Sequence, residues 1–554
     1  MRCTVPACQQ NGCNQRQRYG LTGDTLRIDA IRPRITYYGL LSLQRFLNAH
    51  QTWSPCVTSE ITRGHQPVQQ YNTNLIEAQN MSVFRAPVCA LLICLIFPQS
   101  TRSHTQSIED DARPNIIYIM VDDLGYGDLG CFGQKIIQTP NIDRLASEGM
   151  KLTNHYAGHT VCRPSRLVLW TGQHVGHTGL TGNRPRSLTS TEPTVARLLQ
   201  ESGYTTGGVG KWALGHVERP EEIKNSGHPN LNGFDYWFGY MNQGNAHNFY
   251  PTFLWENDRQ VTLPGNVLDP SPAARGRVSS RRVSYSHDFM TEAALNFVRN
   301  HHDVPFLLHI HWTIPHANNE GGRLTGDGME IPSHGIYADR DWPNPEKGFA
   351  AMITYMDRDV GRLMQLLKQL EIENETLVIF TSDNGPHNEG GHSHEYFDSN
   401  GQLTGIKRSM HEGGIRVPTI ARWPHHIVPD TISDHPSAFY DFLPTACELA
   451  GVRPPAKIDG ISYLPTLLGR PAEQEKHEYL YFASEEGETS VGVRYGNWKL
   501  VKYGGNNTEP GSPQDWKLYN LVNDTAEQRD ISAVHTDVTA TILGLLKRDG
   551  LLHE

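Results

Sequence analysis

The sequence predicts an α/β protein in which helices sandwich a large, mostly parallel β-sheet, with a smaller C-terminal antiparallel α+β subdomain. From residue 113 onward, apolar segments of strand length alternate with amphipathic segments of helix length, the pattern of a parallel sheet with helical crossovers. After about residue 451 the pattern changes to short strands separated by Gly, Asn and Pro turns. Strands joined by such short turns pair antiparallel, so this part is predicted to form a smaller unit of its own.

Individual elements follow from the spacing of apolar residues along the chain. Residues 115–121 (NIIYIMV) form a continuous apolar run, as a buried parallel strand requires. Further strands are predicted at residues 205–209, 304–312, 376–381, 479–483, 490–495, 498–503 and 516–521. Helices are predicted at residues 142–150, 164–170, 194–201, 289–299, 349–370 and 533–547. The Pro-, Ser- and Arg-rich segment 263–284 is expected to be a surface loop.

The beginning of the chain differs from the rest. Met81 opens a short segment with one arginine, followed by an apolar run over residues 86–97 and a polar stretch over residues 98–104. This order is typical of a secretory signal peptide, and the run is shorter than the roughly 20 residues that span a bilayer. We therefore expect residues 81–103 to be a signal peptide and residues 1–80 to be a leader outside the mature protein, which would be exported to the periplasm or secreted. The alternative for the apolar run is a buried helix.

Composition excludes several classes of protein. Of the 554 residues, 38% are apolar and 19% charged, an ordinary globular balance. The formal net charge is −10, and residues 1–103 carry ten arginines, no lysine and four acidic residues, which leaves −16 for the remainder. Without a long basic run, the chain is not expected to coat nucleic acid or to bind membranes through a polybasic segment. Only Cys131, Cys162 and Cys447 lie beyond residue 103, too few for a disulfide framework.

Acidic residues follow two of the predicted strands. Asp122 and Asp123 come directly after the first strand, and Asp383 and Asn384 follow the strand at residues 376–381. Ligands of open α/β sheets lie at the carboxyl ends of the strands, and three carboxylates placed together there would repel one another without a cation. Oxygen ligands of this kind suit Ca²⁺ or Mg²⁺. In the alternative interpretation, these residues only cap the turns that follow the strands.

A second chemical feature is the run Cys-Arg-Pro-Ser-Arg at residues 162–166. Proline is tolerated in the first turn of a helix, so Pro164 places Cys162 at a helix N-terminus, with Arg166 on the same face one turn later. Free N–H groups at that position attract anions. A cysteine there is a candidate low-pKa thiolate nucleophile, and the alternative is a structural cysteine.

The run at residues 162–166, followed by Thr-Gly at residues 171–172, resembles the first signature of the formylglycine-dependent sulfatases of the alkaline phosphatase superfamily. Gly-Lys-Trp-Ala-Leu-Gly at residues 210–215 is similar to their second signature, and the resemblance extends in order over residues 113–530. In this family a partner enzyme oxidises the cysteine to formylglycine, an aldehyde that hydrates to a gem-diol. The resemblance therefore implies a sulfuric ester hydrolase for carbohydrate or aryl sulfates, matured by a formylglycine-generating or sulfatase-maturing enzyme.

The resemblance also implies roles for individual residues. The metal ligands that it implies, with Ca²⁺ favoured and Mg²⁺ as the alternative, are Asp122, Asp123, Cys162, Asp383 and Asn384. The catalytic residues that it implies are Cys162, Arg166, Lys211, His316 and Lys407. The three cations would contact the sulfate or the nucleophile, and His316 would protonate the leaving oxygen. Taken alone, His316 would be a structural loop residue and Lys211 a solvated charge. The catalytic domain is expected at residues 104–450 and the C-terminal subdomain at residues 451–554.

One position departs from the family pattern. The family usually has a histidine two residues after the lysine of the second signature, where it is thought to assist sulfate release, and this chain has Ala213 there. The base that would release the sulfate is therefore unassigned. His216 is close in sequence but would point elsewhere if the backbone is the same. We nevertheless expect activity.

Polar residues in two further segments are candidates for substrate binding, namely Gln243, His247, His387 and His394. The first two lie shortly after Gly-Tyr at residues 239–240, and the other two belong to the histidine-rich segment 387–395. Polar and aromatic groups of this kind suit a sugar. The alternatives are a hydrogen-bonded surface loop for the first pair and a zinc site for the second. Because an acidic protein repels a highly sulfated polymer, exo-action on small oligosaccharides is favoured.

Two other functions are compatible with the same residues. A phosphoesterase or phosphonate hydrolase of the same superfamily would use the same site, and kinetics on paired sulfate and phosphate esters would separate it from a sulfatase. A non-catalytic binder of sulfated glycans would result if Cys162 stayed a thiol. The sugar and the position of its sulfate are not encoded in any motif of the chain.

Overall fold

The structure is a computed structural model that describes residues 113–217, 219–225, 227–504 and 516–552. The expected leader (residues 1–80) and signal peptide (residues 81–103) lie outside the described residues. None of the helices in the described part of the chain combines the length and the apolarity that crossing a bilayer requires.

A ten-stranded sheet forms the centre of the described chain. Its five middle strands are all parallel and lie in the order β11 (Thr376–Ser382), β1 (Asn115–Asp122), β10 (Phe306–Pro315), β4 (Thr205–Lys211) and β5 (Tyr236–Tyr240). One flank consists of β12 (Thr419–Arg422), β2 (Met150–Leu152) and β13 (Thr431–Ser433), and the other of β6 (Phe253–Glu256) and β7 (Arg259–Thr262). Antiparallel pairing is confined to these flanks. The predicted α/β fold with a mostly parallel sheet is confirmed.

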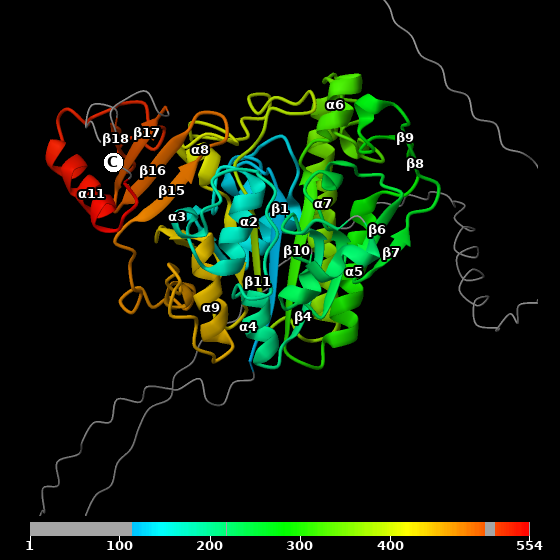
Figure 1. Cartoon of the computed structure of the whole chain (residues 1–554), viewed down its shortest axis with the longest axis horizontal. Coiled ribbons are helices and arrows are strands. Elements are labelled where there is room, and N and C mark those ends of the chain that lie inside the picture. Colours follow the sequence, from blue (N-terminus) through cyan, green and yellow to red (C-terminus); the bar gives the residue numbers. More distant parts are fainter. Residues whose placement is uncertain (1–112, 218, 226, 505–515, 553–554) are drawn as a thin grey trace, which may run out of the picture. The chain divides into compact units, whose positions relative to one another are not determined.

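Helices cover both faces of this sheet (Figure 1). Every side chain of β1 is buried, and alternate residues face opposite cores, because successive side chains of a strand point to opposite sides. Ile116, Tyr118 and Met120 belong to the core shared with α2 (Cys162–Thr171), α4 (Val195–Glu201) and α9 (Phe442–Leu449). Ile117, Ile119 and Val121 belong to the core shared with α1 (Pro140–Ser147), α5 (Ser286–His301) and α7 (Asn344–Gln369).

The segment 263–284, expected to be a surface loop, is partly folded instead. Its strands β8 (Val267–Leu268) and β9 (Ser279–Arg281) pair antiparallel. These strands are short, and the side chain of Asn266 adds hydrogen bonds to the backbone that hold the two ends of the segment together. Asn266 Nδ2 donates to the carbonyl of Ser284 at 2.8 Å, and Asn266 Oδ1 accepts from the N–H of Ser284 at 2.9 Å. Composition favoured a loop because such side-chain-to-backbone bonds leave no periodic pattern in the sequence.

The C-terminal part forms the predicted antiparallel unit. Its four strands, in order, are β15 (Leu480–Ser484), β16 (Ser490–Tyr495), β17 (Trp498–Tyr503) and β18 (Trp516–Asn520). The final helix α11 (Thr536–Arg548) follows them and lies beside this sheet (Figure 1). Its Ile542 and Leu546 are buried in the core. The helix α9 was not predicted, and neither were six strands of the central sheet, namely β2, β5, β6, β7, β12 and β13.

A buried ion-pair network connects this sheet to the centre of the molecule. Lys499 on β17 contacts Glu412 of α8 (Glu412–Ile415) at 2.9 Å and Glu527 at 3.2 Å. The hydroxyl of Tyr156 donates to Glu412 at 2.7 Å. Burial alone would raise the pKa of Glu412, but Lys499 and two nearby arginines lower it to about 2. Lys499 is thus the shared cation of two buried carboxylates.

Replacing Lys499 with Met should destabilise the protein by about 3–5 kcal/mol, because two carboxylates would lose their common partner while staying buried. Differential scanning calorimetry would measure this as a loss of several degrees in Tm. The matched control is Lys517→Met on β18, where the side chain is exposed and the same change should leave Tm nearly unaltered. Equal Tm values for the two variants would contradict the role of this network.

Candidate active site

The four neighbouring parallel strands β11, β1, β10 and β4 deliver the predicted site residues to one edge of the sheet. β1 ends at Asp122, β4 ends at Lys211, His316 directly follows β10, and Asp383 directly follows β11. Because these strands are parallel, their carboxyl ends meet at the same edge. The strand at residues 304–312 runs three residues further than predicted, to Pro315, which places His316 at this edge.

Three carboxylates and one amide lie together there, all fully buried or nearly so. The N–H of Asp123 donates to Asp383 Oδ1 at 3.2 Å, and Asn384 Nδ2 donates to Asp123 Oδ1 at 2.6 Å. Within the described chain, Asn384 Oδ1 has no hydrogen-bond partner. Asp123 has a φ of 66°, in the left-handed region that few non-glycine residues adopt.

The pKa values of two carboxylates in this cluster shift in opposite directions. Burial and the neighbouring carboxylate of Asp122 raise the pKa of Asp383 to about 7, although Arg166 opposes the shift. Burial would also raise the pKa of Asp122, but Lys211 and other nearby cations hold it well below its usual value. Crowded carboxylates of this kind are relieved by a cation, and a buried amide oxygen without a donor is a ready ligand for one. The donor set therefore fits a hard divalent cation.

Two buried cations, Arg166 and Lys211, form ion pairs with these carboxylates. Arg166 donates from Nε and Nη2 to Asp383 Oδ2, at 3.1 and 2.7 Å, and its Nη1 donates to the carbonyl of Lys211 at 2.9 Å. Lys211 Nζ donates to Asp122 Oδ2 at 2.6 Å. Neither side chain is exposed to solvent. Both are fixed in position by partners whose charge opposes their own.

Cys162 is the first residue of α2, as predicted, and it is fully buried. Its Sγ donates to Asp122 Oδ1 at 3.3 Å. The expectation of a low-pKa thiolate is wrong: burial, Asp122 and Asp383 raise the pKa of the thiol well above its ordinary value. The favourable field of a helix N-terminus is outweighed because the thiol has no water around it and faces anions.

A second group of charges lies beside the carboxylates. Lys407 Nζ donates to Asp123 Oδ2 at 2.7 Å and to Glu389 Oε2 at 3.0 Å, and it lies 3.2 Å from His316 Nε2. Glu389 also accepts from Arg408 at 2.6 Å. Glu389 was not among the predicted site residues, because an acid is not expected where an anionic substrate binds. Its place in the histidine-rich segment was the only signal.

The predicted substrate-binding histidines take different positions. The His247 ring stacks on His316, with 4.9 Å between centroids and 23° between planes. His387 is buried, accepts from the N–H of Glu389 at its Nδ1, and donates from Nε2 to the carbonyl of Pro315 at 3.2 Å. Both of its nitrogens are therefore used within the protein, which favours a positioning role. His394 is half-buried and pairs with Asn388 at 2.7 Å, apart from the carboxylate cluster.

The histidine-rich segment does not gather into the zinc site considered for it. His387 bonds the end of β10, His394 bonds Asn388, and His392 pairs with Glu346 at 2.6 Å while stacking on Phe349. Among the described residues, no two of these histidines fall in one group of potential metal ligands.

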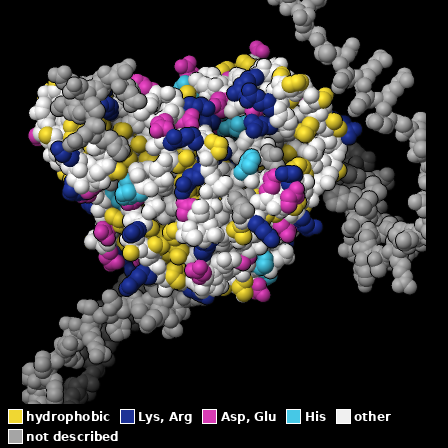
Figure 2. All heavy atoms as spheres, viewed as in Figure 1, with side chains coloured by type: hydrophobic (Ala, Val, Ile, Leu, Met, Phe, Trp, Pro, Cys, Tyr) yellow, Lys and Arg dark blue, Asp and Glu magenta, His cyan; other side chains and the backbone are white. Residues whose placement is uncertain are grey.

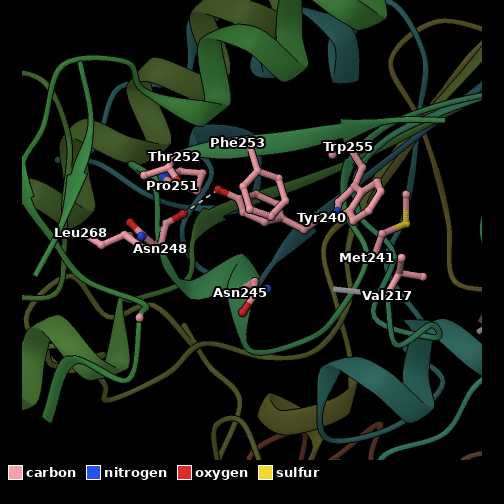
Figure 3. A pocket seen from close by; sticks show the side chains of 12 residues that line it. Val217, Tyr240, Met241, Asn245, Asn248, Pro251, Thr252, Phe253, Trp255 and Leu268 are labelled. Carbon is pink, nitrogen blue, oxygen red and sulfur yellow. Dashed lines mark hydrogen bonds between the residues drawn. The ribbon is translucent and has the colours of Figure 1, made fainter. Parts of the chain in front are cut away.

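Gln243 is half-buried, and its Oε1 has no partner in the described chain. The loop that carries it and His247 borders a pocket lined by aromatic residues of the sheet flank, shown in Figure 3. There the hydroxyl of Tyr240 donates to the carbonyl of Asn248 at 2.6 Å and fixes the loop to the end of β5 (Figure 3).

The position where the family usually has a histidine is occupied by Ala213, which is buried and has a φ of 68°. His216, three residues later, is exposed.

Comparison with known proteins agrees with this geometry. The Sulfatase family model matches residues 114–452, and the model for the C-terminal part of N-sulphoglucosamine sulphohydrolase matches residues 394–548. The chain is 32% identical to the steryl-sulfatase of Rattus norvegicus over 475 residues, which is 72% of this chain and 78% of the relative. It is 31% identical to the N-acetylgalactosamine-6-sulfatase of Mus musculus over 466 residues, covering 78% of this chain and 79% of the relative.

Solved structures show the same fold. The crystal structure of Ps i-CgsB in complex with k-i-k-neocarrahexaose superposes with a TM-score of 0.65 at 27% identity, covering 79% of this chain and 92% of that one. A sulfatase structure from the glycosaminoglycan metabolism of Bacteroides thetaiotaomicron gives a TM-score of 0.63 at 26% identity, covering 79% and 99%. Since the family model spans more than half of the chain and both relatives span more than two thirds of it, the chain belongs to the sulfatase family and is a sulfuric ester hydrolase.

Proposed function

We propose that the protein hydrolyses sulfate esters of carbohydrates, with formylglycine made from Cys162 and a divalent cation in one buried site. The observation that carries the proposal is the contact of Cys162 with Asp122, inside a cluster of three carboxylates that is lined by Arg166 and Lys211. That cluster combines a place for a nucleophile, a place for a cation and fixed positive charge for a sulfate.

The cation would be held by Asp122, Asp123, Asp383 and Asn384, with residue 162 beside them. All their ligand atoms except the sulfur are oxygens, which favours Ca²⁺ or Mg²⁺ over softer metals, and the family resemblance favours Ca²⁺. When bound, the cation would neutralise the crowded carboxylates and polarise the sulfate oxygens. The unpartnered Asn384 Oδ1 and the raised pKa of Asp383 both support a cation at this place.

The raised pKa of the Cys162 thiol is a reason to expect its modification. A buried thiol that stays protonated is a weak nucleophile, so Cys162 itself is poorly suited to attack sulfur. Formylglycine supplies a gem-diol that can accept the sulfuryl group and release sulfate by re-forming the aldehyde. The proposal therefore includes a formylglycine-generating or sulfatase-maturing enzyme as a partner, and export through the signal peptide at residues 81–103.

The remaining residues would orient the ester and its charge. Arg166, Lys211 and Lys407 are buried cations fixed by carboxylates, and they would bind the sulfate oxygens without reorganising during the reaction. His316 Nδ1 lies 2.6 Å from the carbonyl of Ala317, so Nδ1 carries a proton and Nε2 faces Lys407 and the site. A proton on Nε2 would protonate the leaving oxygen.

Burial and Lys407 lower the pKa of His316 to about 3 in this arrangement. A bound sulfate beside Lys407 would offset that cation and raise the pKa, so the acid would form when substrate is present. The methyl group of Ala213 cannot act as a base, so no side chain at that position assists sulfate release.

Two findings support a carbohydrate as the substrate. The relatives include an N-acetylgalactosamine-6-sulfatase and Ps i-CgsB, which was solved with a neocarrahexaose. In addition, His247 stacks on His316 and Arg408 pairs with Glu389, so both could donate to sugar hydroxyls beside the proposed acid, and Gln243 has an unpartnered Oε1 on the loop that carries His247. These polar groups suit a sugar better than the hydrocarbon of a steryl sulfate, although a steryl-sulfatase is also among the relatives.

The central test uses protein purified from its native host. Mass spectrometry of the peptide that carries residue 162 should find formylglycine, and a panel of mono- and disaccharide sulfates should yield a hydrolysed member. Cys162→Ala should lower kcat/KM on that substrate by about 10³-fold or more, because the nucleophile is gone. The matched control Cys131→Ala, at a free cysteine outside the cluster, should retain activity.

Two results would replace the proposal with another function. An unmodified thiol together with glycan binding and no turnover would identify a binder of sulfated glycans. Faster turnover of the paired phosphate esters would identify a phosphoesterase or phosphonate hydrolase.

A second test concerns the cation. Adding Ca²⁺ to chelator-treated protein should raise Tm, because binding at about 100 times Kd stabilises the folded state by about 2.7 kcal/mol. Asn384→Ala should weaken this stabilisation, since it removes the buried amide ligand. Asn388→Ala, at an exposed position four residues away, is the control and should keep it. Equal Ca²⁺-induced shifts in both variants would exclude Asn384 as a ligand.

A further inference from the structure

A second, smaller group of charges lies next to His316 and is connected to it through the ring of His247, which stacks on His316. Its centre is Glu320, at the start of α6 (Asn319–Thr325), whose side chain is only 4% exposed. Glu320 Oε2 lies 3.1 Å from His247 Nδ1, and Oε1 accepts from Arg277 Nη1 at 3.0 Å. Arg323 approaches the same carboxylate at 4.0 Å. One buried carboxylate therefore holds an imidazole and two guanidinium groups.

Arg277 is fixed more firmly than an ordinary surface arginine. Its guanidinium lies directly against the backbone of Gly244, where an added Cβ would stand 2.3 Å from the Arg277 Cζ. Its carbonyl accepts from Asn318 Nδ2 at 3.1 Å. The side chain is nevertheless 31% exposed. In the part of the chain that the structure describes, Nη1 of Arg277 donates to Glu320, whereas Nε and Nη2 donate to no protein acceptor and lie against Gly244, which has no side chain to cover them.

The charge of this group is not balanced. Arg277 and the largely exposed Arg323 together exceed the single charge of Glu320, and the adjoining acid Glu330 has its own partner in Arg282 at 2.7 Å. Figure 2 shows Lys and Arg side chains gathered on this face beside α6. Burial alone would raise the pKa of Glu320, but His247 and Arg277 lower it to about 2, so the carboxylate is charged and continues to orient its partners. A surplus cation of this kind attracts a second anion.

The position of Arg277 relates it to the proposed reaction. Arg277 and His247 share Glu320, and the His247 ring stacks on His316, the proposed acid. We propose that Arg277 binds a second anionic group, a carboxylate or a sulfate, on the sugar next to the one that carries the scissile ester. This inference rests on the proposed function, and it narrows the substrate class to oligosaccharides with at least two anionic groups.

An arginine suits this task because its planar fork matches the two oxygens of a carboxylate or sulfate. Glu320 accepts from Nη1 of Arg277 and thereby orients the rest of the guanidinium group. Gly244 has no side chain, so the guanidinium can lie against its backbone and is held in that orientation. An arginine needed only to neutralise Glu320 would not require an exposed, unpaired edge.

The test measures binding separately from turnover. Titration calorimetry on the Ca²⁺-loaded Cys162→Ala protein would use disaccharides with one sulfate, at position 2, 4 or 6 of the non-reducing sugar, and a uronate as the second sugar. Each is compared with its uronate methyl ester. At least one carboxylate form should bind about ten- to a hundredfold more tightly than its ester, because the charge-assisted hydrogen bonds are lost in the ester.

Matched variants assign this preference to one residue. Arg277→Gln should abolish the difference between acid and ester while leaving the affinity for the ester within about twofold. Arg277→Lys should keep part of the difference, because charge remains without the fork. Arg275→Gln removes the same charge from an exposed position two residues away, and this variant should keep the full difference in affinity between the acid and its methyl ester.

The inference is overturned if no disaccharide binds better than its methyl ester, or if Arg275→Gln causes the same loss as Arg277→Gln. Its failure is distinguishable from failure of the proposed function. Hydrolysis of sulfated sugars by the unsubstituted protein without any preference for the acid would reject the subsite alone. Preference for the acid without hydrolysis by the formylglycine form would reject the enzyme mechanism alone.

Discussion

The mutual repulsion of Asp122, Asp123 and Asp383 is the constraint on which the centre of this molecule depends. Each carboxylate is buried, and burying three charges side by side costs far more folding free energy than burying isolated polar groups. Arg166, Lys211 and Lys407 offset them through contacts of 2.6–2.7 Å. These cations are themselves buried and would be unstable without the acids. The raised pKa of Asp383 indicates that the balance is incomplete, which is why a divalent cation forms part of the proposed site.

The fold brings these charges together through strand direction and then holds the surrounding loops. Four parallel strands end at one edge of the sheet, and α2 starts there with Cys162. The segment carrying Lys407 has no regular structure, but its backbone is fixed on both sides: the N–H of Lys407 donates to Pro386, and that of Arg408 to Thr160. The following helix α8 is held by Lys499 of the C-terminal sheet through Glu412. The C-terminal unit thereby supports the edge of the sheet that carries the carboxylate cluster, without supplying any of the three carboxylates.

Two acids outside the cluster have a related role. Glu389 holds Lys407 and Arg408, and Glu320 holds Arg277 and the ring of His247, so each orients groups that lie next to His316 or contact its neighbours. In an acidic protein, positive charge that is concentrated in this way attracts an anionic substrate to one place. The acids do not cancel that attraction, because each faces more than one cation. They fix the direction in which the cations point.

The sequence by itself determined the four central strands that carry the site residues, most of the helices, the antiparallel C-terminal unit and the family, because apolar periodicity and the run at residues 162–166 are local features. It also named the acidic and cationic residues of the carboxylate cluster. It missed the helix α9 and six strands of the central sheet, namely β2, β5, β6, β7, β12 and β13. It also did not predict the short β8–β9 pair within residues 263–284, and the candidate low-pKa thiolate at Cys162 has a raised pKa instead. Only the tertiary structure identified Glu389, Glu320 and Arg277 and showed that the ring of His394 pairs with Asn388. The physical reason is that burial and the charge of neighbours distant in sequence set both a pKa and a partner, and neither leaves a pattern in the chain.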